Sequence, residues 1–153
     1  MKLCDKTMAN DRGFTMIEMI VVLVMIGILV AVALSRISFT GSELYAEANL
    51  LKANLRFAQW RALTVNDSTS TTWGISLSGN SYTLQKDGAN ATVSFPSDGL
   101  AIHTLSSGVT VSGPGTVTYD YWGSPGAGNV TITLTEAGVS TSFTISGTTG
   151  HIP

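Results

Sequence analysis

The distribution of apolar and polar positions divides the chain into three stretches. The first is an apolar run in which residues 19–35 contain no charged side chain. At a rise of 1.5 Å per residue, this run would span roughly 25 Å as a helix, which is close to the hydrocarbon thickness of a bilayer. A soluble helix seldom stays apolar on all sides over such a length. The run therefore predicts a membrane-spanning helix.

In the second stretch, residues 42–65, apolar residues recur at steps of three and four positions. This spacing is that of one helix face, and the predicted stripe consists of Leu44, Ala48, Leu51, Leu55, Ala58, Ala62 and Val65. The charged residues are expected mostly on the other faces, namely Glu43, Glu47, Lys52, Arg56 and Arg61. Since no proline occurs between residues 14 and 65, we expect one long helix that bends, if at all, near Gly27 or Gly41.

In the third stretch, from residue 71 onward, apolar residues alternate with polar ones, which indicates antiparallel strands. One hairpin is predicted around Gly79-Asn80, and a second, clearer one runs from Val130 to Ile145 around the sequence TEAG. Further strands are expected at residues 92–95, 109–111 and 117–121. A helix with one apolar stripe and a sheet with one apolar face can cover each other. The pattern therefore predicts an α+β protein with the helix packed on an antiparallel sheet.

The segment before the apolar run is short and mixed in charge, with Lys2, Lys6 and Arg12 against Asp5 and Asp11. The positive-inside rule predicts that this flank stays in the cytoplasm and that the part after Arg36 is exported. A cleaved secretory signal is an alternative, although its apolar region is usually shorter, and AVALSRIS resembles a cleavage site only loosely. Because the single cysteine, Cys4, lies in the flank, the exported part can form no internal disulfide.

The sequence RGFTMIEMIVVLVMIGILVAVAL resembles the class III signal of type IV pilins and of type II secretion pseudopilins. In that signal a short basic leader ends in glycine, a phenylalanine follows, and a glutamate lies four residues later in the apolar helix. The resemblance implies that a prepilin peptidase cuts between Gly13 and Phe14 on the cytoplasmic side and methylates the new amine of Phe14. The apolar helix would then be retained in the mature protein.

Glu18 is the charged residue that the apolar run must accommodate. A lone carboxylate costs on the order of 2.5–3.5 kcal/mol at the centre of a bilayer and less near the interface. One interpretation is that Glu18, four residues from the mature terminus, reaches the membrane surface. The resemblance implies another role, in which Glu18 pairs with the Phe14 amine of a neighbouring subunit and sets the axial register of a filament. Desolvation offsets most of the Coulomb attraction in a buried ion pair, so such a pair adds little stability. It is better suited to fixing the register.

Later sequences are similar to the GspH/FimT group within this family. They are EANLLKANLRFAQWRALTVNDSTSTTWGISL, TYDYWGSPGAGNVTITL and TSFTISGTTGHIP, in that order. The resemblance implies a type IV pilin-like fold with a leader at residues 1–13, a transmembrane and filament-core helix at 14–35, an amphipathic half-helix at 36–66 and a periplasmic β-sheet domain at 67–153. It also implies that the mature protein is anchored in the bacterial inner membrane and joins a filament.

An enzyme is the first alternative class. The exported part has two histidines, His103 and His151, and we expect both to be ordinary surface or loop residues. No set with metal-ligand spacing is present, and no nucleophile elbow surrounds any serine. The sequence GSPGAGN lacks the Lys-Ser/Thr of a phosphate-binding loop, so it predicts a turn. We therefore expect no catalysis, no metal and no cofactor.

DNA binding is the second alternative, because some FimT-type minor pilins capture DNA through a basic C-terminal region. Such binding requires several cations. From residue 66 onward the chain has only Lys86, against Asp67, Asp87, Asp98, Asp120 and Glu136. The composition therefore argues against a nucleic-acid partner. A major pilin is a third alternative, but those subunits commonly carry a C-terminal disulfide that this chain cannot form.

We therefore expect a structural minor pseudopilin or minor pilin that starts or caps a filament. The sequence distinguishes poorly between a subunit of a type II secretion pseudopilus and a subunit of a type IV pilus. Partners would be prepilin peptidase, the inner membrane and other pilins or pseudopilins, contacted through the helix and through glycine-rich loops such as Gly113–Gly115 and Gly123–Gly128.

Overall fold

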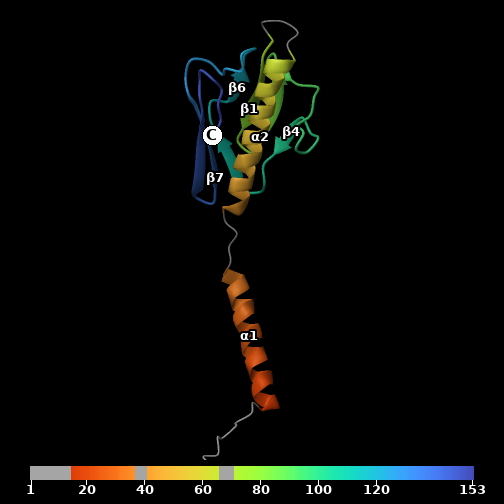
Figure 1. Cartoon of the computed structure of the whole chain (residues 1–153), viewed down its shortest axis with the longest axis vertical. Helices are drawn as coiled ribbons and strands as arrows, with labels where there is room; N and C mark the ends of the chain where they lie inside the picture. The colour runs from red at the N-terminus through yellow and green to blue at the C-terminus, as the bar shows by residue number, and fades with distance from the viewer. Residues whose placement is uncertain (1–14, 37–40, 66–70) are drawn as a thin grey trace, which may run out of the picture. The chain divides into compact units, whose positions relative to one another are not determined.

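The computed structural model describes residues 15–36, 41–65 and 71–153, and its contacts divide into two units. The N-terminal unit contains helix α1, Met16–Arg36 (Figure 1). Its apolar side chains from Met16 to Leu34 are exposed, which is the arrangement expected when lipid or protein takes the place of water around them. Residues Met16–Leu34 are long and apolar enough to cross a membrane.

The second unit begins with helix α2, Ser42–Thr64, which follows Gly41. Gly41 has a φ of 99°, a left-handed conformation that glycine adopts without strain and that a helix cannot continue through. The expected helix is therefore interrupted at Gly41, whereas Gly27 lies inside α1 without breaking it. Residues 37–40, between the two helices, lie outside the described part of the chain.

In the described part of the same unit, eight strands follow α2. They are β1 (Trp73–Ser78), β2 (Ser81–Lys86), β3 (Ala89–Asn90), β4 (Ile102–Thr104), β5 (Val109–Ser112), β6 (Thr116–Tyr119), β7 (Val130–Glu136) and β8 (Val139–Ile145). All pairings are antiparallel. Sheet A has the order β3-β2-β1-β6 with β4 also paired to β2, and sheet B has the order β5-β7-β8.

The strand predictions are largely confirmed. The two expected hairpins are β1–β2, which turns at Gly79-Asn80, and β7–β8, which turns at Ala137-Gly138. Residues 109–111 and 117–121 correspond to β5 and β6, the latter ending at Tyr119.

The prediction of a strand at residues 92–95 is wrong. The Phe95 amide donates to the Leu100 carbonyl, and the Phe95 carbonyl accepts from Gly99, so both backbone groups close a local loop. Pro96 follows directly and has no N–H to continue a ladder.

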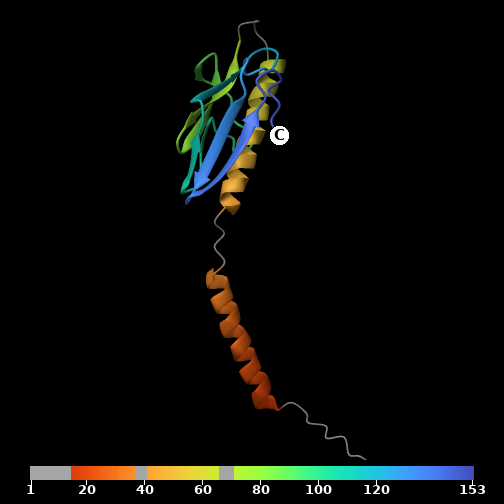
Figure 2. The same cartoon turned by 90° about the vertical axis from the view of Figure 1, so that its left-hand side faces the viewer.

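The core lies between α2 and the two sheets, since α2 contacts β1, β6, β7 and β8 (Figure 2). The predicted stripe is confirmed: its members from Leu44 to Ala62 are buried, and Val65 is half-buried. Facing them are the buried residues Trp73, Ile75, Tyr82, Leu84, Val117, Tyr119, Ile132, Leu134, Phe143 and Ile145. Helix and sheets therefore cover each other as the amphipathic pattern predicts.

Candidate functional site: the first turn of α1 and a polar network on α2

The first turn of α1 has a defined cap. The Glu18 N–H donates to the Thr15 carbonyl at 3.1 Å and lies 3.4 Å from the Thr15 hydroxyl oxygen, while the Met19 N–H also reaches the Thr15 carbonyl at 3.3 Å. Threonine at this position with glutamate three residues later is the sequence of a capping box. A carboxylate in the first turn also interacts favourably with the positive end of the helix dipole.

The Glu18 carboxylate itself accepts no hydrogen bond from any residue of the described ranges, and the side chain is exposed. Helix capping therefore accounts for the Glu18 backbone amide and leaves the charge available to a partner. Gly13 and Phe14, the residues of the predicted cleavage site, lie outside the described residues.

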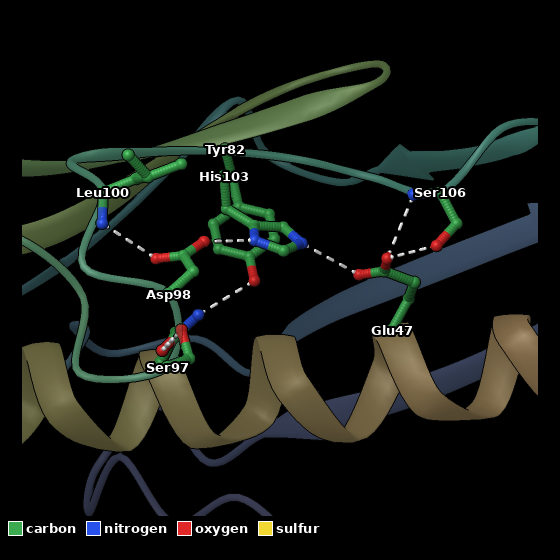
Figure 3. A network of polar contacts seen from close by, with 8 residues as sticks. Glu47, Tyr82, Ser97, Asp98, Leu100, His103 and Ser106 are labelled. Atoms are coloured by element: carbon green, nitrogen blue, oxygen red, sulfur yellow. Dashed lines mark hydrogen bonds and ion pairs between the residues drawn. The ribbon is translucent and has the colours of Figure 1, made fainter.

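A second polar cluster lies on the side of α2 that faces β2 and β4 (Figure 3). His103, on β4, is its centre: the ring Nδ1 lies 2.6 Å from an Asp98 carboxylate oxygen, and the ring Nε2 lies 3.1 Å from a Glu47 oxygen. The ring also stacks on Tyr82 with the centroids 4.8 Å apart. Neutral imidazole has a single N–H, whereas the protonated ring donates from both nitrogens. Each ring nitrogen of His103 therefore has a carboxylate oxygen as its acceptor when it carries a proton.

The cluster ties α2 to the segments on either side of β4. The second oxygen of the Glu47 carboxylate accepts from the Ser106 backbone N–H at 3.0 Å and from the Ser106 hydroxyl at 2.7 Å. The Asn54 amide donates to the Tyr82 hydroxyl at 2.9 Å, and the Asn54 carbonyl lies 3.2 Å from the Ser97 hydroxyl. One face of α2 is thus joined to the β3–β4 loop and to the chain after β4.

Two pKa values in this cluster are displaced. Burial raises the pKa of Asp98, but the hydrogen bonds from His103 and the Leu100 amide outweigh it, so the pKa lies below the ordinary 3.8. Burial raises the pKa of the Tyr82 hydroxyl well above its usual range, so this group stays a neutral phenol.

The contacts of Ser106, Glu47 and His103 differ from those of common catalytic and metal sites. The Ser106 hydroxyl bonds to Glu47 and not to His103, so the serine–histidine contact of many acyl-transfer sites is not formed here. Within the described ranges, no group of three or more His, Cys, Asp or Glu side chains is arranged to hold a metal ion. The hydrogen bonds that are present join the β4 region to α2.

Comparison with known proteins bears on the N-terminal segment. Residues 8–34 match the family model described as the prokaryotic N-terminal methylation motif. No curated protein and no solved structure matches the chain significantly. The chain carries a type IV pilin-like prepilin signal. This signal indicates a pilin-like or pseudopilin-like substrate of prepilin peptidase, and the matched residues include Gly13, Phe14 and Glu18.

The sequence interpretation of the polar network needs two corrections. Glu47 was expected mostly off the buried face, yet it is only 7% exposed, because His103 and Ser106 satisfy its charge. His103 was expected as an ordinary surface or loop histidine, yet it lies on β4 with a side chain only 13% exposed. The spacing could have indicated that Glu47 is buried, because it lies three residues after Leu44 and four before Leu51 and so shares their helix face.

The two other residue groups singled out in the sequence are exposed to different degrees. His151 is exposed near the C-terminal end. The loop from Gly113 to Gly115 is exposed between β5 and β6, whereas Gly123 is buried against the Gln59 and Leu63 side chains of α2. The predicted contact loops therefore present different amounts of surface.

Proposed function

We propose that the protein is a structural minor subunit of the GspH/FimT group, which prepilin peptidase processes between Gly13 and Phe14 and methylates on the Phe14 amine. The observation that carries the proposal is Glu18, a carboxylate without a hydrogen-bond donor in the described chain, in the first turn of an exposed apolar helix within the prepilin signal. In this proposal the helix is a single-pass inner-membrane anchor with a cytoplasmic N-terminus. The α2–sheet unit faces the periplasm.

Assembly in this proposal uses the apolar surface of α1. Side chains exposed along the whole of Met16–Leu34 suit a lipid environment and also close packing against other apolar helices. Glu18 then meets the Phe14 amine of a neighbouring subunit, which sets the axial register. Because the pair forms only where amine and carboxylate lie at the same depth, it discriminates between registers that the apolar surface alone would accept.

The test is incorporation into filaments. Glu18→Ala and the isosteric Glu18→Gln remove the charge, and we expect both to leave the α2–sheet unit folded while lowering the amount in purified filaments at least about tenfold, as loss of roughly 1.4 kcal/mol would do. Met19→Leu, one residue further along the same exposed helix, is the matched control and should assemble normally. Wild-type amounts of Glu18→Gln in sheared filaments would refute the register role.

We assign the protein first to a type II secretion pseudopilus, where it would help to start or cap the filament. The alternative is a minor pilin of a type IV pilus, with a role in DNA uptake in some members of that branch. Cross-linking in intact cells, with identification of the captured subunits, separates the two: secretion pseudopilins support the first and pilus subunits the second. A gel shift with DNA at low salt tests DNA binding directly.

A further inference from the structure

Strand β8 forms one outer edge of sheet B. It has seven residues, VSTSFTI, whereas β3, β4, β5 and β6 have two to four. Natural proteins usually protect a long edge with lysine, proline or a bulge, because its unpaired backbone groups accept another strand. β8 has no charged residue and no proline, and its register with β7 is uninterrupted from Val139 to Ile145.

The register identifies which backbone groups of β8 point outward. Ala137 and Gly138 have φ values of 47° and 84°, so they form a two-residue turn whose flanking pair, Glu136 and Val139, is hydrogen-bonded. Bonded and non-bonded pairs then alternate along an antiparallel ladder. The N–H and C=O groups of Ser140, Ser142 and Thr144 therefore point away from β7.

Two contacts agree with this alternation. In β5, Val111 lies opposite Leu134 of β7, and its N–H points the other way, to the Gly79 carbonyl. Beyond the end of β8, the Ser146 N–H donates to the His151 carbonyl, and the Ser146 carbonyl accepts from Gly150. The C-terminal residues thus close the edge at Ser146, and no backbone bond from Ser140, Ser142 or Thr144 to a further described segment is present.

The side chains beside this edge indicate the charge of a strand that would fit it. On the face covered by α2, the Lys52 amine lies 5.2 Å from the centre of the Phe143 ring. Lys52 forms no ion pair with a carboxylate among the described residues. Arg56, one turn further along α2, donates to the Ile152 carbonyl. On the helix side, Lys52 thus lies beside the middle of the edge, while the Glu136 carboxylate at the turn end accepts from the Gly41 N–H. The opposite face carries the hydroxyls of Ser140, Ser142 and Thr144.

We propose that β8 accepts an extended strand of a partner protein, which hydrogen-bonds to Ser140, Ser142 and Thr144 and carries a carboxylate on the side facing α2, within reach of Lys52. This is recognition by strand addition, in which backbone bonds supply affinity and alternate side chains supply specificity. An acidic strand fits better than a second copy of β8, because a second copy would bring its own Lys52 to the same edge. The proposal is independent of N-terminal processing.

The test uses the full chain in a nonionic detergent and a fluorescent seven-residue peptide with the sequence TVTETVT. The control peptide has lysine in place of glutamate. We expect the glutamate peptide to bind about five- to tenfold more tightly than the lysine peptide. The glutamate can form an ion pair with Lys52, whereas the lysine of the control peptide is repelled by it. Lys52→Glu should reverse this preference, and it does so without touching the strand.

The backbone contribution is tested with Ser142→Pro against Ser142→Thr. Proline removes an N–H that points to solvent, which an edge strand tolerates, so we expect the protein to stay folded and peptide affinity to fall at least about tenfold. Threonine keeps the N–H and should bind normally. Equal binding by the two variants, equal binding of the two peptides or no binding of either would overturn the proposal. So would self-association that Ser142→Pro abolishes without any peptide binding, since the edge would then belong to a second copy.

Discussion

Tyr82 and Tyr119 are both fully buried, but their hydroxyl groups differ in what they contact. The Tyr82 hydroxyl accepts from the buried Asn54 amide at 2.9 Å, whereas the Tyr119 hydroxyl has no hydrogen-bond partner in the described part of the chain. Removing a hydroxyl that satisfies a buried group leaves that group unpaired, while removing an unpaired hydroxyl leaves nothing behind. The same chemical change should therefore have different consequences at the two positions.

We predict that Tyr82→Phe lowers the free energy of unfolding by about 1–3 kcal/mol, and that Tyr119→Phe leaves it unchanged or raises it. Urea unfolding of the full chain in detergent, followed by tryptophan fluorescence, measures both, because all three tryptophans lie in the α2–sheet unit. Equal losses in the two variants would contradict the assignment of Asn54 as the partner of Tyr82.

The contact between Asp98 and His103 should make stability depend on pH. The pKa of Asp98 is lower in the folded protein than its ordinary 3.8, so the contribution of its charge is present above about pH 4 and is lost as the pH falls through the folded-state pKa. Asp98→Asn should therefore lower the free energy of unfolding at neutral pH by roughly 0.5–1 kcal/mol, a value suited to a partly exposed pair.

The check is urea unfolding of the full-length wild type and Asp98→Asn at neutral pH and at about pH 2.5. The difference between the two proteins should shrink as the pH falls, since protonation of the wild-type carboxyl removes the contribution of its charge. A difference that stays constant over this range would mean that the carboxylate charge does not contribute to stability.

At the scale of elements, α2 holds the α2–sheet unit together through one face. Leu55 is completely buried on that face, whereas Leu63 on the same helix is 49% exposed. Leu55→Ala should lower the free energy of unfolding by about 2–5 kcal/mol, because a cavity remains where the side chain was. Leu63→Ala is the matched control and should cost less than about 1 kcal/mol. Similar losses at both positions, measured by urea unfolding, would contradict the one-sided packing of α2.

The elements that could be predicted are those whose pattern repeats several times. The stripe from Leu44 to Ala62 and the alternation in β7 and β8 are long enough for the period to be visible. β3 and β4, with two and three residues, are too short to show a period. They form because a tight turn at Asp87-Gly88 and the loop around Phe95 return the chain to β2.

The polar network was missed for a different reason. Glu47 and His103 are 56 positions apart, and each satisfies the other only after α2 packs beside β4. A charged residue at a core-facing helical position indicates such a partner but does not identify it. In contrast, the N-terminal signal was readable because its residues are contiguous and their chemistry is local: a glycine, a phenylalanine and a glutamate at fixed spacing before an apolar run.

At the scale of the whole molecule, the chain combines an apolar helix that can cross a membrane with a separate unit that has a core of its own. Residues 8–34 carry the prepilin signal, which explains the position of the apolar run: it follows a leader that is expected to be removed. In the proposed function, the apolar helix becomes the start of the mature protein and is retained. Glu18 would lie four residues from the new terminus, close enough to the membrane surface to meet another subunit's amine.

The most direct measurement is the mass and N-terminal sequence of the full-length protein, recovered from the membranes of cells that contain a prepilin peptidase. We predict a mature chain that begins at N-methylated Phe14 and retains α1, and an uncleaved chain when Gly13 is replaced by leucine. A wild-type chain that keeps its leader, or one that begins after residue 35, would contradict the assignment of residues 8–34 as a prepilin signal.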